Sequence, residues 1–337
     1  MIAIEYHADL KEVQSDAALA TLLSSEMQQT PFDRLAWWQG LAEHCGIEPL
    51  LAVARDGDST TVLPLQRANG ALSGLANWYS FRLRPVASPG ADATGMLTAL
   101  ARDLARKAPR LTLAGLPDED GSAELVETAF RRAGWIALRE TCDTNHVLHL
   151  QGRSYDAYLA GRPGPLRTTL KRKTAKVETR IFNQFDAEAW ADYEDIYAES
   201  WKPSEGSPDF LRGFAQAEGA AGRLRLGVAY AEGRAVAAQM WTIEGGTAFI
   251  HKLAHREDAK PLSPGTVLSA ALFREVIDTD GVGLIDFGTG NDGYKRDWME
   301  EVRPRYRLEM IRPEAPQNWP FLAKRALKRL AGRGKRG

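Results

Sequence analysis

The sequence predicts an α/β protein in which a mixed β-sheet flanked by helices occurs twice along the chain. Apolar runs of strand length alternate with segments of helical periodicity, and this order is similar in residues 1–150 and 151–312. The chain has 337 residues, 44% of them hydrophobic and 26% charged, which is enough for two domains that each bury a core. We therefore expect two tandem α/β domains followed by a tail over residues 313–337.

Helix-start and turn signals divide the first half. Pro31 is expected to begin a helix, because proline is favoured in the first helical turn. Asp56-Gly57-Asp58 separates two apolar runs and predicts a hairpin. The expected strands are 2–6, 50–54, 60–66, 110–114 and an extended segment at 135–150, and the expected helices are 17–23, 31–41, 90–106 and 122–133.

The second half begins with helices and continues with a meander of strands. Glycine-containing turns at 232–234 and 244–246 separate the meander strands. Helices are expected at 155–160, 166–176, 187–200 and 209–218, and strands at 177–182, 224–231, 235–243 and 247–253. A helix at 267–277, a strand at 282–287, a helix from residue 294 and a last strand complete the chain.

Residues 248–305 are the most informative segment for function. A strand leads through a charged loop into Leu262-Ser263-Pro264-Gly265-Thr266, where a helix begins. Free backbone N–H groups at such a helix start favour a phosphate or a carboxylate. The next strand carries an acid, Asp286, and ends in a glycine-rich turn, residues 288–293. The pattern indicates a site at the ends of these two strands.

This segment resembles the C-terminal half of bacterial GNAT-superfamily acyltransferases of the FemAB-like kind. Glu199-Ser200-Trp201-Lys202 and Ala237-Ala238-Gln239-Met240-Trp241 are also similar to the family, so the resemblance covers roughly residues 150–312. It implies two tandem GNAT-like acyl-CoA N-acyltransferase domains, 1–150 and 151–312, the second of them catalytic. The implied donor is acyl-CoA, although FemAB relatives in the narrow sense use aminoacyl-tRNA.

The resemblance also implies where the donor lies, namely with its pyrophosphate at the turn from Leu262 to Thr266. The family's loop is rich in Gln, Arg and Gly, and this one has a single Gly and a Pro. The donor-binding candidates are Leu262, Ser263, Gly265, Thr266, Tyr294 and Lys295. The alternative for the Ser-Pro-Gly-Thr turn is a plain helix N-cap, and that for Lys295 is pairing with Asp292 or Asp297.

Transfer to an amine also needs a group that removes a proton, and three residues are candidates. His251 stands at a strand end and has an unperturbed pKa suited to base catalysis, but it is equally readable as a packing histidine. Asp286 lies in an apolar strand, where the alternative is an ion pair with Lys252 or Lys295. Glu199 is the third candidate, with a solvent-facing carboxylate as its alternative.

The acceptor-binding candidates follow from the family resemblance and from charge. They are Trp201, Lys202, Trp241, Lys252, Arg167 and Lys171. Arg167 and Lys171 share one face of a helix and could meet a phosphorylated substrate or an anionic lipid, or could simply be solvated.

The tail, 313–337, is basic and amphipathic. On a helical wheel its apolar arc is made by Trp319, Leu322, Ala323, Ala326, Leu327 and Leu330, and its other side by Lys324, Arg325, Lys328 and Arg329. This pattern predicts a helix lying on an anionic membrane surface. The alternative is a helix docked on the protein and followed by a basic end.

Bulk properties exclude several classes. The formal net charge of −1 gives no general attraction to nucleic acid, and the tail has no interleaved aromatic residues for stacking on bases. Cys45 and Cys142 are too far apart in sequence for a metal motif and fit a reducing cytosol, and no metal ligand set is visible. The start of the chain lacks a signal-peptide pattern, and no apolar run is long enough to span a bilayer.

These observations predict a cytoplasmic protein, peripheral to the inner membrane, that transfers an acyl group from CoA to a lipid-like amine, with a sphingoid base as one fitting acceptor. Three alternatives stay open. They are N-acylation of an amino sugar in exopolysaccharide or capsule synthesis, FemX-like aminoacyl transfer to a peptidoglycan precursor, and a non-catalytic scaffold for envelope synthesis.

Overall fold

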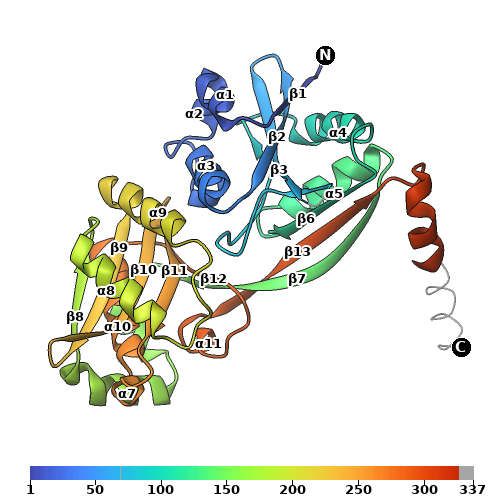
Figure 1. Cartoon of the computed structure of the whole chain (residues 1–337). Helices are drawn as coiled ribbons and strands as arrows, with labels where there is room; N and C mark the ends of the chain where they lie inside the picture. The colour runs from blue at the N-terminus through green and yellow to red at the C-terminus, as the bar shows by residue number, and fades with distance from the viewer. Residues whose placement is uncertain (69, 326–337) are drawn as a thin grey trace, which may run out of the picture.

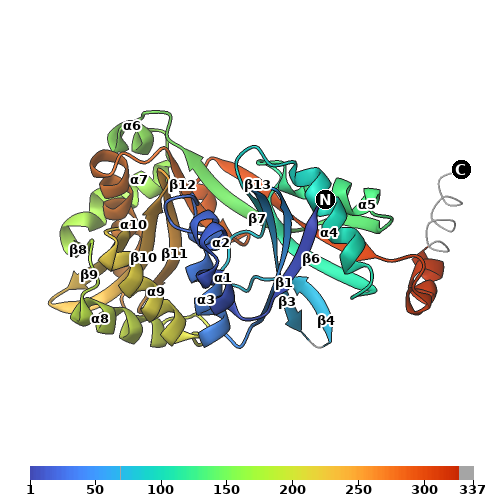
Figure 2. The same ribbon diagram turned by 90° about the horizontal axis from the view of Figure 1, so that it is seen from above.

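A single mixed β-sheet runs through the whole molecule. The computed structural model describes residues 1–68 and 70–325. Within them thirteen strands form one sheet in the order β1-β2-β3-β4-β6-β13-β7-β12-β11-β10-β9-β8, with β5 paired to β3 (Figures 1 and 2). The predicted α/β class with mixed sheets is confirmed.

The strands are β1 (Ala3–His7), β2 (Glu48–Asp56), β3 (Ser59–Ala68), β4 (Ala71–Gly74), β5 (Val86–Ala87), β6 (Arg110–Leu116), β7 (Ile136–His149), β8 (Glu178–Phe182), β9 (Leu224–Ala231), β10 (Arg234–Glu244), β11 (Thr247–His255), β12 (Leu284–Thr289) and β13 (Glu301–Ile311). The α-helices are α1 (Leu10–Ser15), α2 (Ala17–Leu22), α3 (Leu35–His44), α4 (Ala93–Leu104), α5 (Ser122–Arg132), α6 (Tyr155–Ala160), α7 (Gly164–Lys173), α8 (Ala187–Ala198), α9 (Pro208–Ala220), α10 (Pro264–Arg274) and α11 (Lys295–Trp298). A further helix begins at residue 319.

Several helix boundaries differ from the sequence prediction, and three of them bear on the site or on the contact between the halves. Residues Pro31–Asp33 form a short 3-10 turn, and α3 begins only at Leu35. Helix α10 begins at Pro264, three residues earlier than expected, and continues as a π-turn over Glu275–Thr279. The helix expected from residue 294 is the four-residue α11.

Strands β7 and β13 join the two halves of the sheet. They pair with each other from Ile136 to Val147, and β7 then pairs with β12 while β13 pairs with β6. Figure 1 shows these two strands as a long ribbon between the groups of helices. A strand that follows residue 300 therefore completes the first half of the sheet, and the proposed division at residue 150 stays a prediction.

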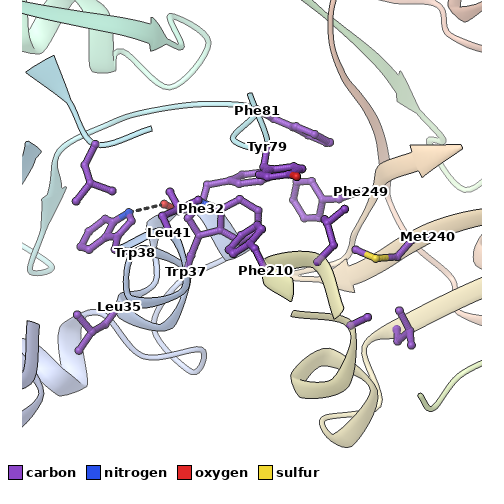
Figure 3. Close-up of a cluster of buried hydrophobic side chains, with 14 of the residues drawn as sticks. Phe32, Leu35, Trp37, Trp38, Leu41, Tyr79, Phe81, Phe210, Met240 and Phe249 are labelled. Atoms are coloured by element: carbon purple, nitrogen blue, oxygen red, sulfur yellow. Dashed lines mark hydrogen bonds between the residues drawn. The ribbon is translucent and has the colours of Figure 1, made fainter. Parts of the chain in front are cut away.

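Three apolar cores lie against the sheet. One packs under α4 and α5, and a second packs under α6, α7 and α10. The third includes residues from both halves, because Phe32 contacts Phe249 of β11 and Trp37 of α3 contacts Phe210 of α9 (Figure 3). Aromatic ring contacts between residues far apart in sequence thus fix the two halves against each other.

The tail is described only up to residue 325. Asn318 is buried and its amide donates to Pro109 O and Arg312 O, both at 2.9 Å, while Phe321 lies under the Arg110 guanidinium. Trp319 is 58% exposed. The predicted positions Ala326, Leu327, Lys328, Arg329 and Leu330 lie outside the described residues. Among the described helices, none has the length and apolar character needed to cross a bilayer.

Candidate active site

The central feature is the place where β11 and β12 separate. The two strands are parallel and paired only through Thr247–Phe249 and Leu284–Asp286. From Ile250 onward the described ladder of β11 is with β10 alone. Past this point no strand of the described residues pairs with β11 on the side that β12 has left, so its backbone groups there have no ladder partner. The connection after β11 leads directly into α10.

A β-bulge lies on β11 at the point of separation. Met240 pairs with Lys252 and Trp241 pairs with Ile250, so His251 is the extra residue. Bulges re-aim side chains, and here His251 and Lys252 both reach the aromatic residues around α3, α8 and α9. Two adjacent residues of one strand are thereby directed to the same region.

His251 is enclosed by aromatic rings. The centroids of Phe32, Trp37, Phe81, Phe214 and Phe249 lie 5.1–6.4 Å from its ring. Its Nε2 is 2.7 Å from Thr242 Oγ1. Burial lowers the pKa of His251 to about 3, so the imidazole is neutral at pH 7. A base with so low a pKa takes up a proton poorly, and the surroundings favour the packing interpretation.

Asp286 lies in β12 and binds the backbone near the C-terminal end of that strand. It is buried, and its Oδ1 accepts hydrogen bonds from Asn145 Nδ2 at 2.7 Å and from Gly288 N at 2.8 Å. Asn145 in turn accepts from Arg305 Nη2 at 2.8 Å. Burial raises the pKa of Asp286, although both hydrogen bonds oppose that shift. Its partners are therefore Asn145 and a backbone amide rather than the Lys252 or Lys295 considered from the sequence.

Glu199 lies outside this region. Its carboxylate is 58% exposed and forms ion pairs with Arg256 and, at 3.4 Å, with Arg234. The hydrogen bond from Arg256 lowers the pKa of Glu199. The arrangement matches the solvent-facing alternative for this residue.

A cluster of lysines borders the separated strands. Lys252 Nζ lies 2.7 Å from Glu205, whose carboxylate also accepts a hydrogen bond from Tyr79. Burial, and next the nearby charge of Lys252, lowers the pKa of Lys202 to about 8. Lys295 is buried on α11, donates to Thr289 O, and has a pKa lowered by burial. A large fraction of Lys202 is therefore uncharged at slightly alkaline pH.

The start of α10 has the features of an anion site. Ser263 adopts a left-handed conformation (φ 54°), and the first helical bond runs from Val267 N to Ser263 O at 3.1 Å. The amides of Gly265 and Thr266 precede that bond and so lie among the unsatisfied donors of the helix start. Gln239 Nε2 donates to Gly265 O at 3.1 Å, which fixes the turn on the sheet.

Nearby groups fit a pyrophosphate at this turn. Lys173 Nζ donates to Pro261 O at 2.8 Å, and Lys260 lies in the same loop. The ring of His255, at the end of β11, packs against Trp201 in a tilted arrangement with centroids 4.4 Å apart. Cations, free amides and a half-exposed indole therefore surround the turn between β11 and α10. Leu262 itself is half-buried against the core under α10.

Other predicted contact residues are dispersed. Trp241 is fully buried in the core under α10, with Nε1 donating to Gln239 Oε1 at 2.9 Å. Arg167 and Lys171 are exposed on α7. Tyr294 is 39% exposed and its ring meets the ring of Phe287 edge-on. The structure thus brings together His251, Lys252, Lys202, Lys295 and Asp286, and leaves Trp241, Arg167 and Lys171 apart from them.

The fold and the separated strands are those expected of a GNAT domain, and comparison with known proteins agrees with this class. Residues 164–296 match the family model described as an acetyltransferase (GNAT) domain. The chain therefore carries a GNAT domain, and the family resemblance in its second half is confirmed. No curated protein matches the sequence of this chain.

Solved structures of similar fold cover nearly the whole chain. The C-terminal domain of a putative lysylphosphatidylglycerol synthetase from Agrobacterium fabrum is 12% identical, with a TM-score of 0.60 over 95% of this chain and 97% of that one. FemX is 10% identical, with a TM-score of 0.59 over 91% and 97%. A tandem GNAT protein from the clavulanic acid pathway is 16% identical, with a TM-score of 0.54 over 93% and 100%. These likenesses establish a tandem GNAT-like fold.

The sequence did not reveal those site residues that are distant in sequence from the strands they contact. Phe32, Phe81 and Tyr79 come from the first half, more than 120 residues before the side chains they contact. Glu205 lies close to the Glu199-to-Lys202 segment, but no feature of the sequence distinguishes it. No local periodicity marks these positions, because their role arises only when the two halves pack.

Proposed function

We propose that the protein is an acyl-CoA-dependent N-acyltransferase that forms an amide on a lipid-like amine at the cytoplasmic membrane surface. The observation that carries the proposal is the separation of β11 from β12 directly before the free amides of α10. The pyrophosphate of CoA would bind Gly265, Thr266 and the adjacent lysines. The thioester would then lie between the strands, beside the bulge at His251.

The transfer step uses this chain's own groups. The neutral amine attacks the thioester carbonyl, and backbone N–H groups of β11 beyond Phe249 stabilise the oxyanion. The C–S bond breaks, CoA leaves as a thiolate, and the amine nitrogen loses a proton. Lys202 is the proposed proton acceptor, since a pKa of about 8 is closer to neutral pH than the pKa of His251.

The donor could instead be an aminoacyl ester, which the FemAB resemblance also implies. The structure of the clavulanic acid pathway protein is named as one without AcCoA. Other proteins of similar fold are named for lysylphosphatidylglycerol synthesis or as FemX. The helix-start amides with basic residues suit a compact pyrophosphate. We therefore favour acyl-CoA, and nothing in the site selects a sphingoid base over other amphiphilic amines.

The proposed contact with the membrane is argued from the described part of the tail. Trp319 is exposed on a helix that begins beside Asn318, and Lys324 and Arg325 follow it. An exposed tryptophan next to basic residues suits a lipid headgroup region.

The proposal is tested by incubating the protein with decanoyl-CoA and n-decylamine, and measuring free thiol and the amide by mass spectrometry. We expect stoichiometric release of thiol with amide, and a kcat that rises with pH to a plateau above about pH 8. Lys202→Met should lower kcat by about 10²-fold and remove that rise. Amide formation from an aminoacyl-tRNA but not from acyl-CoA would replace the donor assignment, and no transfer from either would refute the function.

A further inference from the structure

A cavity of about 410 Å³ lies between α8 and α9, beside the lysine cluster. Aromatic and apolar side chains form most of its wall, namely Trp190, Tyr193, Tyr197, Ala198, Pro208 and Leu211. Its volume is that of a pocket for a small organic ligand. The proposed donor site does not use it.

The acidic groups of its wall are already engaged. Glu194 accepts from Trp190 Nε1 at 2.8 Å and from Arg212 Nη2. Glu205 accepts from Tyr79 and pairs with Lys252. A sugar needs several free hydrogen-bonding groups for its hydroxyls, because unmatched polar groups are costly to bury. The wall therefore suits an apolar occupant better than a carbohydrate.

Glu205 Oε2 makes no hydrogen bond but pairs with Lys252, so among the buried and unbonded atoms of the wall within the described residues only the Tyr193 hydroxyl lacks any polar partner. Tyr193 is 2% exposed, and its hydroxyl makes no hydrogen bond within the described residues. An unpaired buried hydroxyl costs about 1–3 kcal/mol. A ligand that brings one polar atom on a mostly apolar body would satisfy it.

The cavity adjoins the proposed reaction centre through shared side chains. Lys202 and Glu205 belong to its wall, and Glu205 contacts Lys252 on β11, next to the bulge at His251. A molecule held between α8 and α9 would thus place one end beside the separated strands.

We propose that this cavity binds the apolar body of the acceptor, and that the acceptor is an amphiphilic amine rather than an amino sugar. The acceptor role rests on the proposed function, whereas binding of the amine requires no donor. This assignment distinguishes a lipid-like amine from an amino sugar, two of the acceptors that the sequence leaves open.

Filling the cavity from its rim tests the inference. Ala198 is exposed and lines the cavity, so Ala198→Phe adds a ring there without disturbing the core. Ala191 is exposed on the same helix and does not belong to the wall, so Ala191→Phe is the matched control. Calorimetry should show that n-decylamine binds the wild type and Ala191→Phe equally, and Ala198→Phe at least about tenfold more weakly. Tyr193→Phe should weaken binding by about two- to tenfold.

The outcomes separate this inference from the proposed function. Equal decylamine affinity in all variants, or glucosamine binding that Ala198→Phe abolishes, overturns the inference. If decylamine is acylated and Ala198→Phe leaves its KM unchanged, the inference fails and the function stands. If Ala198→Phe weakens decylamine binding but no amide forms with either donor, the cavity assignment holds and the function fails.

Discussion

At the scale of single residues, environment decides chemistry more than residue type does. His251 and Lys252 are neighbours on one strand, but the imidazole lies among five rings and the ammonium pairs with Glu205. The sequence could propose both residues, since a strand-end histidine is a usual candidate base. It could not supply the pKa of His251, because the residues that desolvate it lie in other elements and in the other half.

His251 should make the protein sensitive to acid. Its pKa in the folded state is about 3 against an ordinary value of 6.5, so the unfolded chain binds the extra proton. The stabilisation is complete above pH 6.5 and is lost as the pH falls toward 3, by at most about 1.4 kcal/mol per pH unit. Urea unfolding across this range should show a shallower pH dependence for His251→Gln than for wild type. The exposed His149→Gln is the control, and identical slopes in the two variants would contradict the prediction.

At the scale of elements, the ends of β11 and β12 position the site. β12 leaves β11 through Gly288, which has a φ of 68°, and a Cβ there would lie 2.9 Å from the Phe81 ring. The glycine-rich turn was visible in the sequence as a site marker. Its close contact with Phe81 was not, because Phe81 lies on a loop of the first half.

Gly288→Ala should therefore destabilise the protein through both strain and contact. Gly246→Ala is a matched control, because its φ is 71° and nothing lies within 4 Å of the added Cβ. We expect Gly288→Ala to lose about 1–3 kcal/mol more than the control in chemical unfolding. Equal losses would mean that Phe81 moves aside freely.

At the scale of the whole molecule, a buried ion cluster and shared strands tie the halves together. Arg34, before α3, donates to Glu218 of α9 at 3.0 Å and to Glu244 of β10 at 2.6 Å. Burial raises the pKa of Glu244 to about 7, against the opposing effect of Arg34. The order of the strands along each half could be predicted from the sequence, except for the short β4 and β5, which were not expected. The pairing of β7 with β13 could not be predicted, because strand partners depend on long-range packing.

Removing the arginine should uncover this coupling. Arg34→Met leaves Glu244 buried without its cation, and we expect a loss of about 3–5 kcal/mol in the free energy of unfolding. Adding Glu244→Gln should restore part of that loss by removing the uncompensated charge. A loss below about 1 kcal/mol for Arg34→Met would show that the cluster does not stabilise the packing of the halves.

The central claim is that the start of α10 binds the pyrophosphate of an acyl-CoA, and calorimetric titration of CoA tests it most directly. Thr266→Glu places a carboxylate in the first turn, where it favours the helix but repels a phosphate. Thr168→Glu makes the same change at an exposed position of α7. We predict that wild type and Thr168→Glu bind CoA alike and that Thr266→Glu binds it at least about tenfold more weakly. CoA affinity that is absent in the wild type, or unchanged by Thr266→Glu, would contradict the claim.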